Sequence, residues 1–308
     1  MASTPTGSLL QGRLLRWYRK YGRAELPWRV LRSQYRTLVS EFMLAQTQVE
    51  RVVPKFEAFV ERFPDFAALA RASLGEVLRA WKGLGYNSRA VRLHRLAVCV
   101  VETHGGQLPS DAASLRQLPG LGPYGVAAVR AFAFDLDDAP VDTNIRRIVH
   151  RLCFGTEHPP RASALELDRR ARALMPPGRA HDWNSAMMDL GATICSARAP
   201  KCLLCPLHPD CAAAPVDAAA LETARRANGK PPSPQNAIPF ERSRRFARGR
   251  IVDRLRELPA GQRVSLLDLR RALEGASRWT VADVGELVGA LERDGLVTRD
   301  GNGVALRE

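Results

Sequence analysis

Short amphipathic stretches dominate the first two-thirds of the chain. Apolar residues there recur every three or four positions, and Gly or Pro separates one stretch from the next. This spacing is typical of helices, and few stretches show the apolar/polar alternation of strands. We therefore predict an all-α domain over residues 9–212, with helices that include 9–21, 37–63, 74–83, 88–104, 112–118, 124–134 and 143–154.

The pattern changes after residue 212. Residues 213–240 are rich in Ala and Pro and have no sustained apolar period beyond one short helix, so we predict a linker there. Three further helices are predicted at 246–258, 265–273 and 280–294. Asp300 and Gly301 then lie between two short apolar runs, which indicates a hairpin. Three helices followed by a hairpin predict a winged-helix-like module over 241–308.

Four cysteines lie at the end of the all-α region. Cys195, Cys202, Cys205 and Cys211 follow the spacing C-x6-C-x2-C-x5-C, and four thiolates this close together can enclose one metal centre. Thiolate sets select zinc or iron–sulfur clusters. Zinc sites more often show two matched C-x2-C halves, which this run lacks. The spacing therefore favours a [4Fe–4S] cluster, with zinc or a disulfide as alternatives.

A glycine-rich corner precedes an apolar helical run. Residues 118–125 have the sequence LPGLGPYG, and two glycines on either side of one apolar residue predict a tight hairpin. Backbone N–H groups at the start of the following helix can point at an anion, which suits a DNA phosphate. The alternative is an ordinary helix–turn–helix corner with glycine caps. About twenty residues later comes the motif VDTNIRR at 141–147.

The chain resembles the helix-hairpin-helix DNA glycosylases, and among them the MutY-type adenine glycosylases in their short actinobacterial form. The resemblance covers residues 14–212. It implies a two-lobed all-α core, with a six-helix barrel lobe that contains the helix-hairpin-helix at 31–140, a cluster lobe at 141–212, and an N-terminal helix within 1–30 that packs on the cluster lobe. The matching motifs are the cysteine run, SEFMLAQTQV (40–49), WKGLGYNSRA (81–90), LPGLGPYGVAAV (118–129), VDTNIRR (141–147) and WNSAMMDLGATIC (183–195).

Three residues are candidates for catalysis. Apolar neighbours of Glu41 should raise the pKa of its carboxyl group, as a general acid requires, although an exposed Glu on an amphipathic helix is the alternative. The resemblance implies that Glu41 protonates the purine and later activates water. Asp142 precedes a helical run and is predicted to cap it; the resemblance adds stabilisation of the sugar. The resemblance places Tyr124 where strand-cleaving relatives carry a Schiff-base lysine, so we expect no covalent imine. The alternative to a catalytic role for Tyr124 is a packing Tyr with a hydrogen-bonded hydroxyl.

The resemblance also implies contacts to DNA and to the extruded base. Ser185 replaces a Gln or Glu that reads the adenine edge in many relatives, so this contact is shortened or missing. Taken alone, Trp28 would be assigned to a core and Gln46 to a solvated helix face. The implied base-pocket residues are Trp28, Arg29 and Ser185, those that enter the base stack are Gln46 and Tyr86, and those that meet the backbone are Leu118, Gly120, Gly122, Arg198 and Lys201.

Composition agrees with a nucleic-acid partner. The 308 residues carry a formal net charge of +14, which suits a polyanion such as DNA but also a ribosomal or membrane-surface protein. No apolar run reaches the roughly 18 residues that a membrane span needs. We therefore expect a monomer in the cytoplasm, associated with the nucleoid and not with a membrane.

These observations predict a monofunctional base-excision-repair enzyme. Its expected reaction is hydrolysis of the N-glycosidic bond of adenine mispaired with guanine or 8-oxoguanine in double-stranded DNA. A T/G or U/G mismatch glycosylase on the same scaffold is one alternative. A non-catalytic iron–sulfur DNA-binding protein is another. The module at 241–308 stands where longer relatives carry a Nudix-like domain that recognises 8-oxoguanine, so the preference between the two opposing bases stays open.

Overall fold

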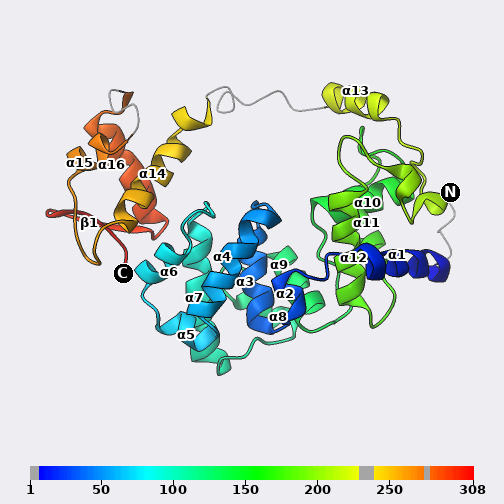
Figure 1. The fold of residues 1–308 in the computed structure, drawn as a ribbon, viewed down its shortest axis with the longest axis horizontal. Coiled ribbons are helices and arrows are strands. Elements are labelled where there is room, and N and C mark those ends of the chain that lie inside the picture. The colour runs from blue at the N-terminus through cyan, green and yellow to red at the C-terminus, as the bar shows by residue number, and fades with distance from the viewer. Residues whose placement is uncertain (1–6, 229–238, 274–277) are drawn as a thin grey trace. The chain divides into compact units, whose positions relative to one another are not determined.

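The structure is a computed structural model that describes residues 7–228, 239–273 and 278–308 (Figure 1). Most of these residues are helical, as predicted. They divide into two compact units, and each is described by itself. The first comprises Met1–Leu38, Pro109–Gln117 and Leu121–Lys230, and the second comprises Val39–Leu108, Leu118–Gly120 and Pro231–Glu308.

Several helices belong wholly to the first unit. They are α1 (Gly7–Tyr21), α2 (Pro27–Val30), α8 (Ala112–Gln117), α9 (Pro123–Ala128), the π-helix η1 (Val129–Ala133), α10 (Thr143–Phe154), α11 (Ala164–Leu174), α12 (Ala180–Thr193), the short 3-10 turns η2 (Cys202–Leu204) and η3 (His208–Asp210), and α13 (Ala218–Asn228).

The core of the first unit is built from amphipathic helices. In α10, the residues Ile145, Ile148, Val149 and Leu152 are spaced to share one face, and all four are buried. This face packs on α12, whose Trp183 is also in the core. Helix α1 packs on α12 as well and adds its own apolar residues to the same cluster. These contacts fix the region just before the cysteine run.

A further set of elements belongs wholly to the second unit. They are α4 (Val49–Arg62), α5 (Phe66–Arg71), α6 (Leu74–Ala80), α7 (Ser88–His104), the 3-10 turn η5 (Phe240–Arg242), α14 (Arg244–Arg256), α15 (Leu266–Arg271), α16 (Val281–Arg293), β1 (Val297–Asp300) and β2 (Gly303–Leu306). Helices α5 and α6 both pack on α7. Phe59 of α4 meets the buried Trp81 edge to face, with ring centroids 5.9 Å apart.

The prediction of one helix over 37–63 is wrong. The segment forms α3 (Gln34–Leu44), which runs from the first unit into the second, and then α4. Between them Gln46 adopts a left-handed backbone with φ +65°. The intervening AQTQ has no Gly or Pro, so its sequence gives no sign of a break. The break is instead supported by hydrogen bonds from Arg89, which are described below.

The C-terminal residues form the predicted three helices and hairpin. Strands β1 and β2 pair antiparallel, with Val297 opposite Leu306, and Val264 adds an isolated bridge to Val304. Gly303 makes this bridge possible, because a Cβ atom at that position would lie 2.7 Å from the carbonyl oxygen of Val264. The winged-helix-like prediction for this module is therefore confirmed.

The segment between the last cysteine and the C-terminal module is partly helical. Residues of the predicted linker form α13, whose Leu221 is buried, and residues 229–238 of that segment lie outside the described residues. None of the described helices has the length and apolar character that crossing a membrane requires.

Candidate active site and metal centre

Asp142 lies at the start of α10, as its sequence context predicts. Its Oδ1 accepts a hydrogen bond from the Ile145 backbone N–H at 2.7 Å, which makes it the N-cap. The Asn144 side-chain amide donates to the other oxygen at 3.0 Å. Burial raises the pKa of Asp142, while these hydrogen bonds oppose that shift. A half-buried carboxylate is thus held in one orientation by donors that favour its charged form.

A hydrogen-bonded chain connects Asp142 with the segment that bears the first cysteine. Arg147 Nη2 donates to Asn144 Oδ1 and to the Gly191 carbonyl oxygen, each at 2.8 Å. Arg147 Nε donates to the carbonyl oxygen of Cys195, also at 2.8 Å. The orientation of Asn144, and through it that of Asp142, therefore depends on α12 and on the cysteine segment.

Glu41 lies on α3, in the part that belongs to the second unit. Its side chain is half-buried, and its neighbours in the chain, Ser40 and Phe42, are buried. The apolar residues Val39, Phe42 and Met43 beside it in the helix are buried, and the role of Glu41 as a general acid stays a prediction.

The predicted hairpin has the expected backbone geometry. Gly120 has φ +87°, which favours glycine, and a Cβ atom there would lie 3.0 Å from the Cβ of Arg92. Gly122 is the extended N-cap of α9, and Leu118 is buried. Tyr124 lies in the first turn of α9 and is 39% exposed. The side chain at this position is a phenol and not an amine, and its role in catalysis stays a prediction.

The predicted base-pocket residue Arg29 is anchored by a buried carboxylate that sequence reasoning missed. Its Nη1 lies 2.7 Å from Oδ2 of the fully buried Asp189, which also binds Arg23 at 2.7 Å. Burial alone would raise the pKa of Asp189, but the two guanidinium groups outweigh it and lower the pKa. Arg29 is therefore fixed to α12, where Ser185 is buried one turn before Asp189, and the adjacent Trp28 is half-buried.

Two strained residues mark the loops predicted to enter the base stack. Gln46 has φ +65° and Tyr86 has φ +44°, and in the described residues Asp135 is the one other non-glycine residue with positive φ. Both side chains are exposed. Left-handed conformations of non-glycine residues are uncommon and collect at functional sites, because the surrounding structure must hold them.

Arg89 is the residue that holds these two loops, and we assigned it no role from the sequence. It is only 6% exposed, and its guanidinium donates to backbone and hydroxyl acceptors on both sides. Burial lowers the pKa of Arg89 to about 10, so it stays charged at neutral pH. The acceptors are the carbonyl oxygens of Phe42, Met43, Ala45, Leu84 and Gly85 and the hydroxyl of Thr47, at 2.6–3.2 Å.

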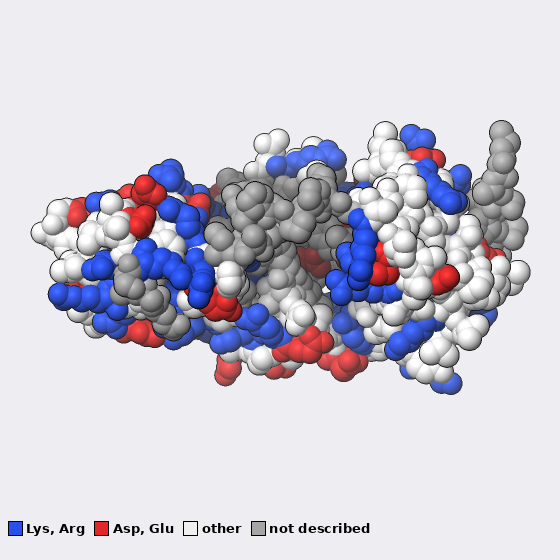
Figure 2. Space-filling model, turned by 90° about the horizontal axis from the view of Figure 1, so that it is seen from above, with Lys and Arg blue, Asp and Glu red and all other residues white. Residues whose placement is uncertain are grey.

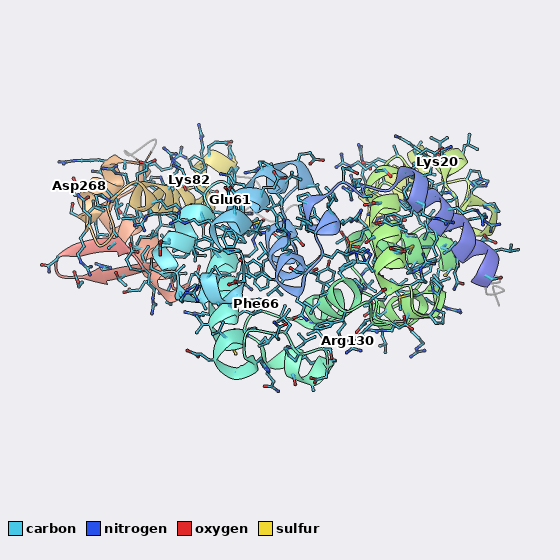
Figure 3. All side chains as sticks on the ribbon, turned by 60° about the horizontal axis from the view of Figure 1, so that its bottom comes forward. Lys20, Glu61, Phe66, Lys82, Arg130 and Asp268 are labelled. Carbon is cyan, nitrogen blue, oxygen red and sulfur yellow. The ribbon has the colours of Figure 1, made fainter. Side chains whose placement is uncertain are left out.

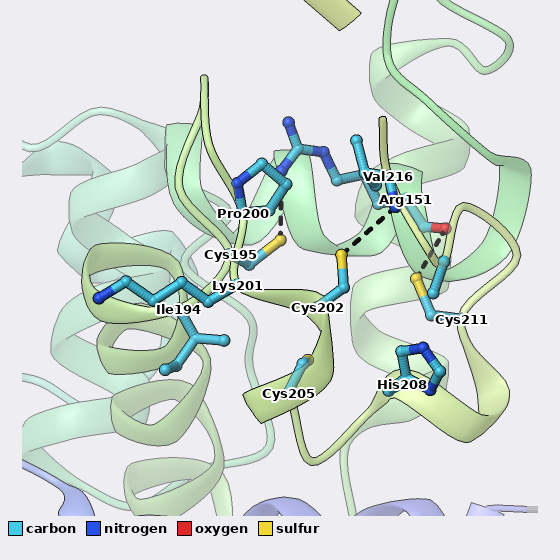
Figure 4. A pocket seen from close by; sticks show the side chains of 11 residues that line it. Arg151, Ile194, Cys195, Pro200, Lys201, Cys202, Cys205, His208, Cys211 and Val216 are labelled. Atoms are coloured by element: carbon cyan, nitrogen blue, oxygen red, sulfur yellow. Dashed lines mark hydrogen bonds between the residues drawn. The ribbon is translucent and has the colours of Figure 1, made fainter. Parts of the chain in front are cut away.

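The four cysteines of the run line one cavity (Figure 4). None forms a disulfide. Arg151 Nη1 lies 3.5 Å from the Sγ of Cys195, and the Val216 backbone N–H donates to the Sγ of Cys202 at 3.4 Å. Burial raises the pKa of the Cys205 thiol to about 12. Such buried sulfurs are stable as thiolates only beside a compensating positive charge.

The chemistry of this cavity fits an iron–sulfur cluster. Four sulfur donors surround one space, and N–H groups directed at sulfur are a means by which proteins tune such clusters. Among the described residues, no group of three or more His, Cys, Asp or Glu side chains is arranged to hold a metal ion. The fit therefore rests on the shared cavity and its donor set. Arg198 and Lys201 are exposed in the same loop.

Comparison with known proteins defines the class. Residues 39–173 match the family model of the HhH-GPD superfamily base excision DNA repair proteins. A solved thermostable thymine-DNA glycosylase is 30% identical, with a TM-score of 0.60 over 66% of this chain and 94% of that one.

Two relatives narrow the assignment. An adenine DNA glycosylase of Mycobacterium tuberculosis is 37% identical over 94% of this chain and 90% of its own length. One of Mycolicibacterium smegmatis is 46% identical over 63% of this chain and 66% of its own length. The chain belongs to the adenine DNA glycosylase family within the helix-hairpin-helix superfamily.

Proposed function

We propose that this protein hydrolyses the N-glycosidic bond of adenine mispaired with guanine or 8-oxoguanine in double-stranded DNA. The observation that carries the proposal is the match to an adenine DNA glycosylase along 94% of the chain, together with Asp142 fixed at a helix N-terminus. The net charge of +14 supports a DNA partner. Figure 2 shows Lys and Arg side chains gathered over the C-terminal module, with fewer Asp and Glu among them.

The chemistry follows from two carboxyl groups with different tasks. Glu41 donates a proton to the adenine ring, so that the base leaves with the electron pair of the bond to C1′. The sugar then carries positive charge, and the carboxylate of Asp142 stabilises it. Water attacks C1′ and loses its proton to Glu41. The hydrogen bonds to Asp142 support this role because they favour its charged form.

Tyr124 limits the reaction to hydrolysis. Its phenol cannot form the imine that strand cleavage by β-elimination requires. The product is therefore an intact strand with an abasic site. We also propose that Trp28, Arg29 and Ser185 surround the extruded base, since the Asp189 anchor fixes Arg29 on the helix that carries Ser185.

We propose that Cys195, Cys202, Cys205 and Cys211 hold a [4Fe–4S] cluster. When bound, the cluster supplies positive charge that keeps the four sulfurs deprotonated and fixes the loop that carries Arg198 and Lys201, which then meet DNA phosphates. Arg147 donates to the backbone carbonyl oxygen of Cys195, so the fixed loop also supports the position of Asn144.

A second candidate is a T/G mismatch glycosylase, favoured by the likeness to the thymine-DNA glycosylase structure. The test is a panel of duplexes with A:G, A:8-oxoguanine, A:T, T:G and U:G pairs under single-turnover conditions. The proposal predicts release of adenine from the first two. Release of thymine or uracil from T:G or U:G, with adenine retained throughout, would establish the second candidate instead.

A further inference from the structure

Side chains of the C-terminal module contact the loop that carries Tyr86. Arg256 of α14 donates from Nη2 to Oδ1 of Asn87 at 2.8 Å, and its side chain is buried. Lys82, labelled in Figure 3, lies 3.5 Å from a carboxylate oxygen of Glu257. These contacts flank Tyr86 on both sides in the chain. The module is therefore attached to the very segment whose central residue is predicted to enter the base stack.

Arg245 makes the contact with Tyr86 itself. Its guanidinium carbon lies 4.0 Å from the centroid of the Tyr86 ring, and that of Arg89 lies 5.4 Å from the same centroid. Both distances are within the approximately 6 Å range of cation–π attraction. Tyr86 is nevertheless 40% exposed, so its ring is held by cations while part of it faces solvent.

The other arginines at the start of α14 are engaged differently. Arg244 pairs with Glu286 at 2.8 Å, and Arg248 pairs with Asp294. In the part of the chain that the structure describes, no acidic side chain forms an ion pair with Arg245. Its guanidinium carbon lies closer to the Tyr86 ring than to the Phe240 ring, whose centroid is 6.0 Å away. Arg244 and Arg245 carry the same charge, but Arg244 pairs with a carboxylate and Arg245 contacts an aromatic ring.

We propose that Arg245 is a positioning residue for Tyr86, through which the C-terminal module takes part in recognising the base pair. The inference rests on the proposed function, because it gives Tyr86 its place in the duplex. Arg89 donates hydrogen bonds to the backbone of the loop that carries Tyr86, at Leu84 and Gly85. Arg245 instead restricts the exposed ring of Tyr86. A ring restrained before DNA arrives loses less rotational freedom on insertion, so binding is tighter than with an unrestrained ring.

The expected effect follows from the exposed setting of the contact. Attraction of this kind at an exposed site corresponds to about a two- to fivefold change in an equilibrium constant. Arg245→Ala should weaken binding to an A:8-oxoguanine duplex by about that factor. The measurement uses Glu41→Gln protein, in which the substrate stays intact. Arg244→Ala is the matched control, since it removes an equal charge from the adjacent position, and it should leave affinity within twofold or so.

A double-mutant cycle separates positioning from a direct DNA contact. If Arg245 acts through Tyr86, Arg245→Ala should have no further effect once Tyr86→Ala is present. The salt dependence of binding should then be the same with and without Arg245. Additive losses, together with a salt slope lowered by about one, would show that Arg245 binds a phosphate and would overturn the inference. An equal loss in Arg244→Ala would overturn it as well.

A measurement on the free protein keeps this inference separate from the proposed function. Amide hydrogen exchange at Tyr86 and Asn87 should be about two- to fivefold faster in Arg245→Ala and unchanged in Arg244→Ala. Unchanged exchange in Arg245→Ala would refute the positioning role even in an enzyme that excises adenine. Faster exchange in a protein that releases no adenine would support the positioning role and contradict the proposed function.

Discussion

Replacing Arg89 with Met should loosen both loops predicted to enter the base stack. The side chain of Met fills a similar volume but donates no hydrogen bonds. Six acceptors between Phe42 and Gly85 would lose a common donor. They include Ala45, Thr47 and Gly85, which lie next to the left-handed Gln46 and Tyr86 in the chain. This substitution tests whether the strained loops are maintained by a single buried cation.

The magnitude can be bounded from the geometry. A hydrogen bond to a charged group contributes about 1.5–3 kcal/mol, but six acceptors share few N–H groups and water can reach the exposed loops. Desolvation also opposes the charge, as the lowered pKa of Arg89 shows. We therefore expect Arg89→Met to reduce the free energy of unfolding by about 3 kcal/mol, not by the sum of six full bonds.

Urea unfolding monitored by circular dichroism measures this change, and single-turnover excision measures its functional consequence. The matched control is Arg92→Met, because Arg92 is exposed one turn farther along α7 and bonds mainly within its own helix. It should shift stability by less than about 0.5 kcal/mol. If Arg89→Met were as stable and as active as the control, the loops would not depend on the buried guanidinium.

Three further predictions concern the site. Asp142→Asn keeps an N-cap oxygen but should abolish excision. Because burial raises the pKa of Asp142, the wild type loses stability as pH rises from the unfolded to the folded pKa. In urea unfolding, the stability of the wild type relative to Asp142→Asn should therefore be lower at pH 7 than in acid. Cys202→Ser should lower the iron content and the broad visible absorption of purified protein, whereas Cys99→Ser should change neither; stoichiometric zinc without iron in the wild type would refute the cluster assignment. Borohydride should trap no covalent adduct between the enzyme and DNA, because residue 124 is not an amine. A robust adduct would show that an amine elsewhere in the protein attacks the sugar.

Local periodicity was sufficient to predict most helices. The helix predicted over 88–104 matches α7 and that over 143–154 matches α10, because both have an apolar face with clear end signals. The N-cap role of Asp142 followed in the same way from one polar residue before an amphipathic run. The C-terminal hairpin followed from Asp300 and Gly301 between apolar runs.

Features that depend on distant partners could not be predicted. The break between α3 and α4 lies in a sequence that favours a continuous helix, and it depends on Arg89, more than 40 positions away in the chain. The bond of Arg29 to Asp189 joins residues 160 positions apart, and no local pattern indicates it. Arg245 was only one of several basic residues until its distance to the Tyr86 ring was known. One signal was available: Arg89 lies within the conspicuous WKGLGYNSRA motif.

The most direct test of the central claim is the identity of the base released by the wild type and by Glu41→Gln. Both proteins are incubated in excess with an A:8-oxoguanine duplex, and free bases are identified by mass spectrometry. The account predicts free adenine from the wild type and none from Glu41→Gln, which still binds the duplex because the amide keeps the shape of the carboxyl group. Adenine release by Glu41→Gln at the wild-type rate, or no adenine from the wild type, would contradict it.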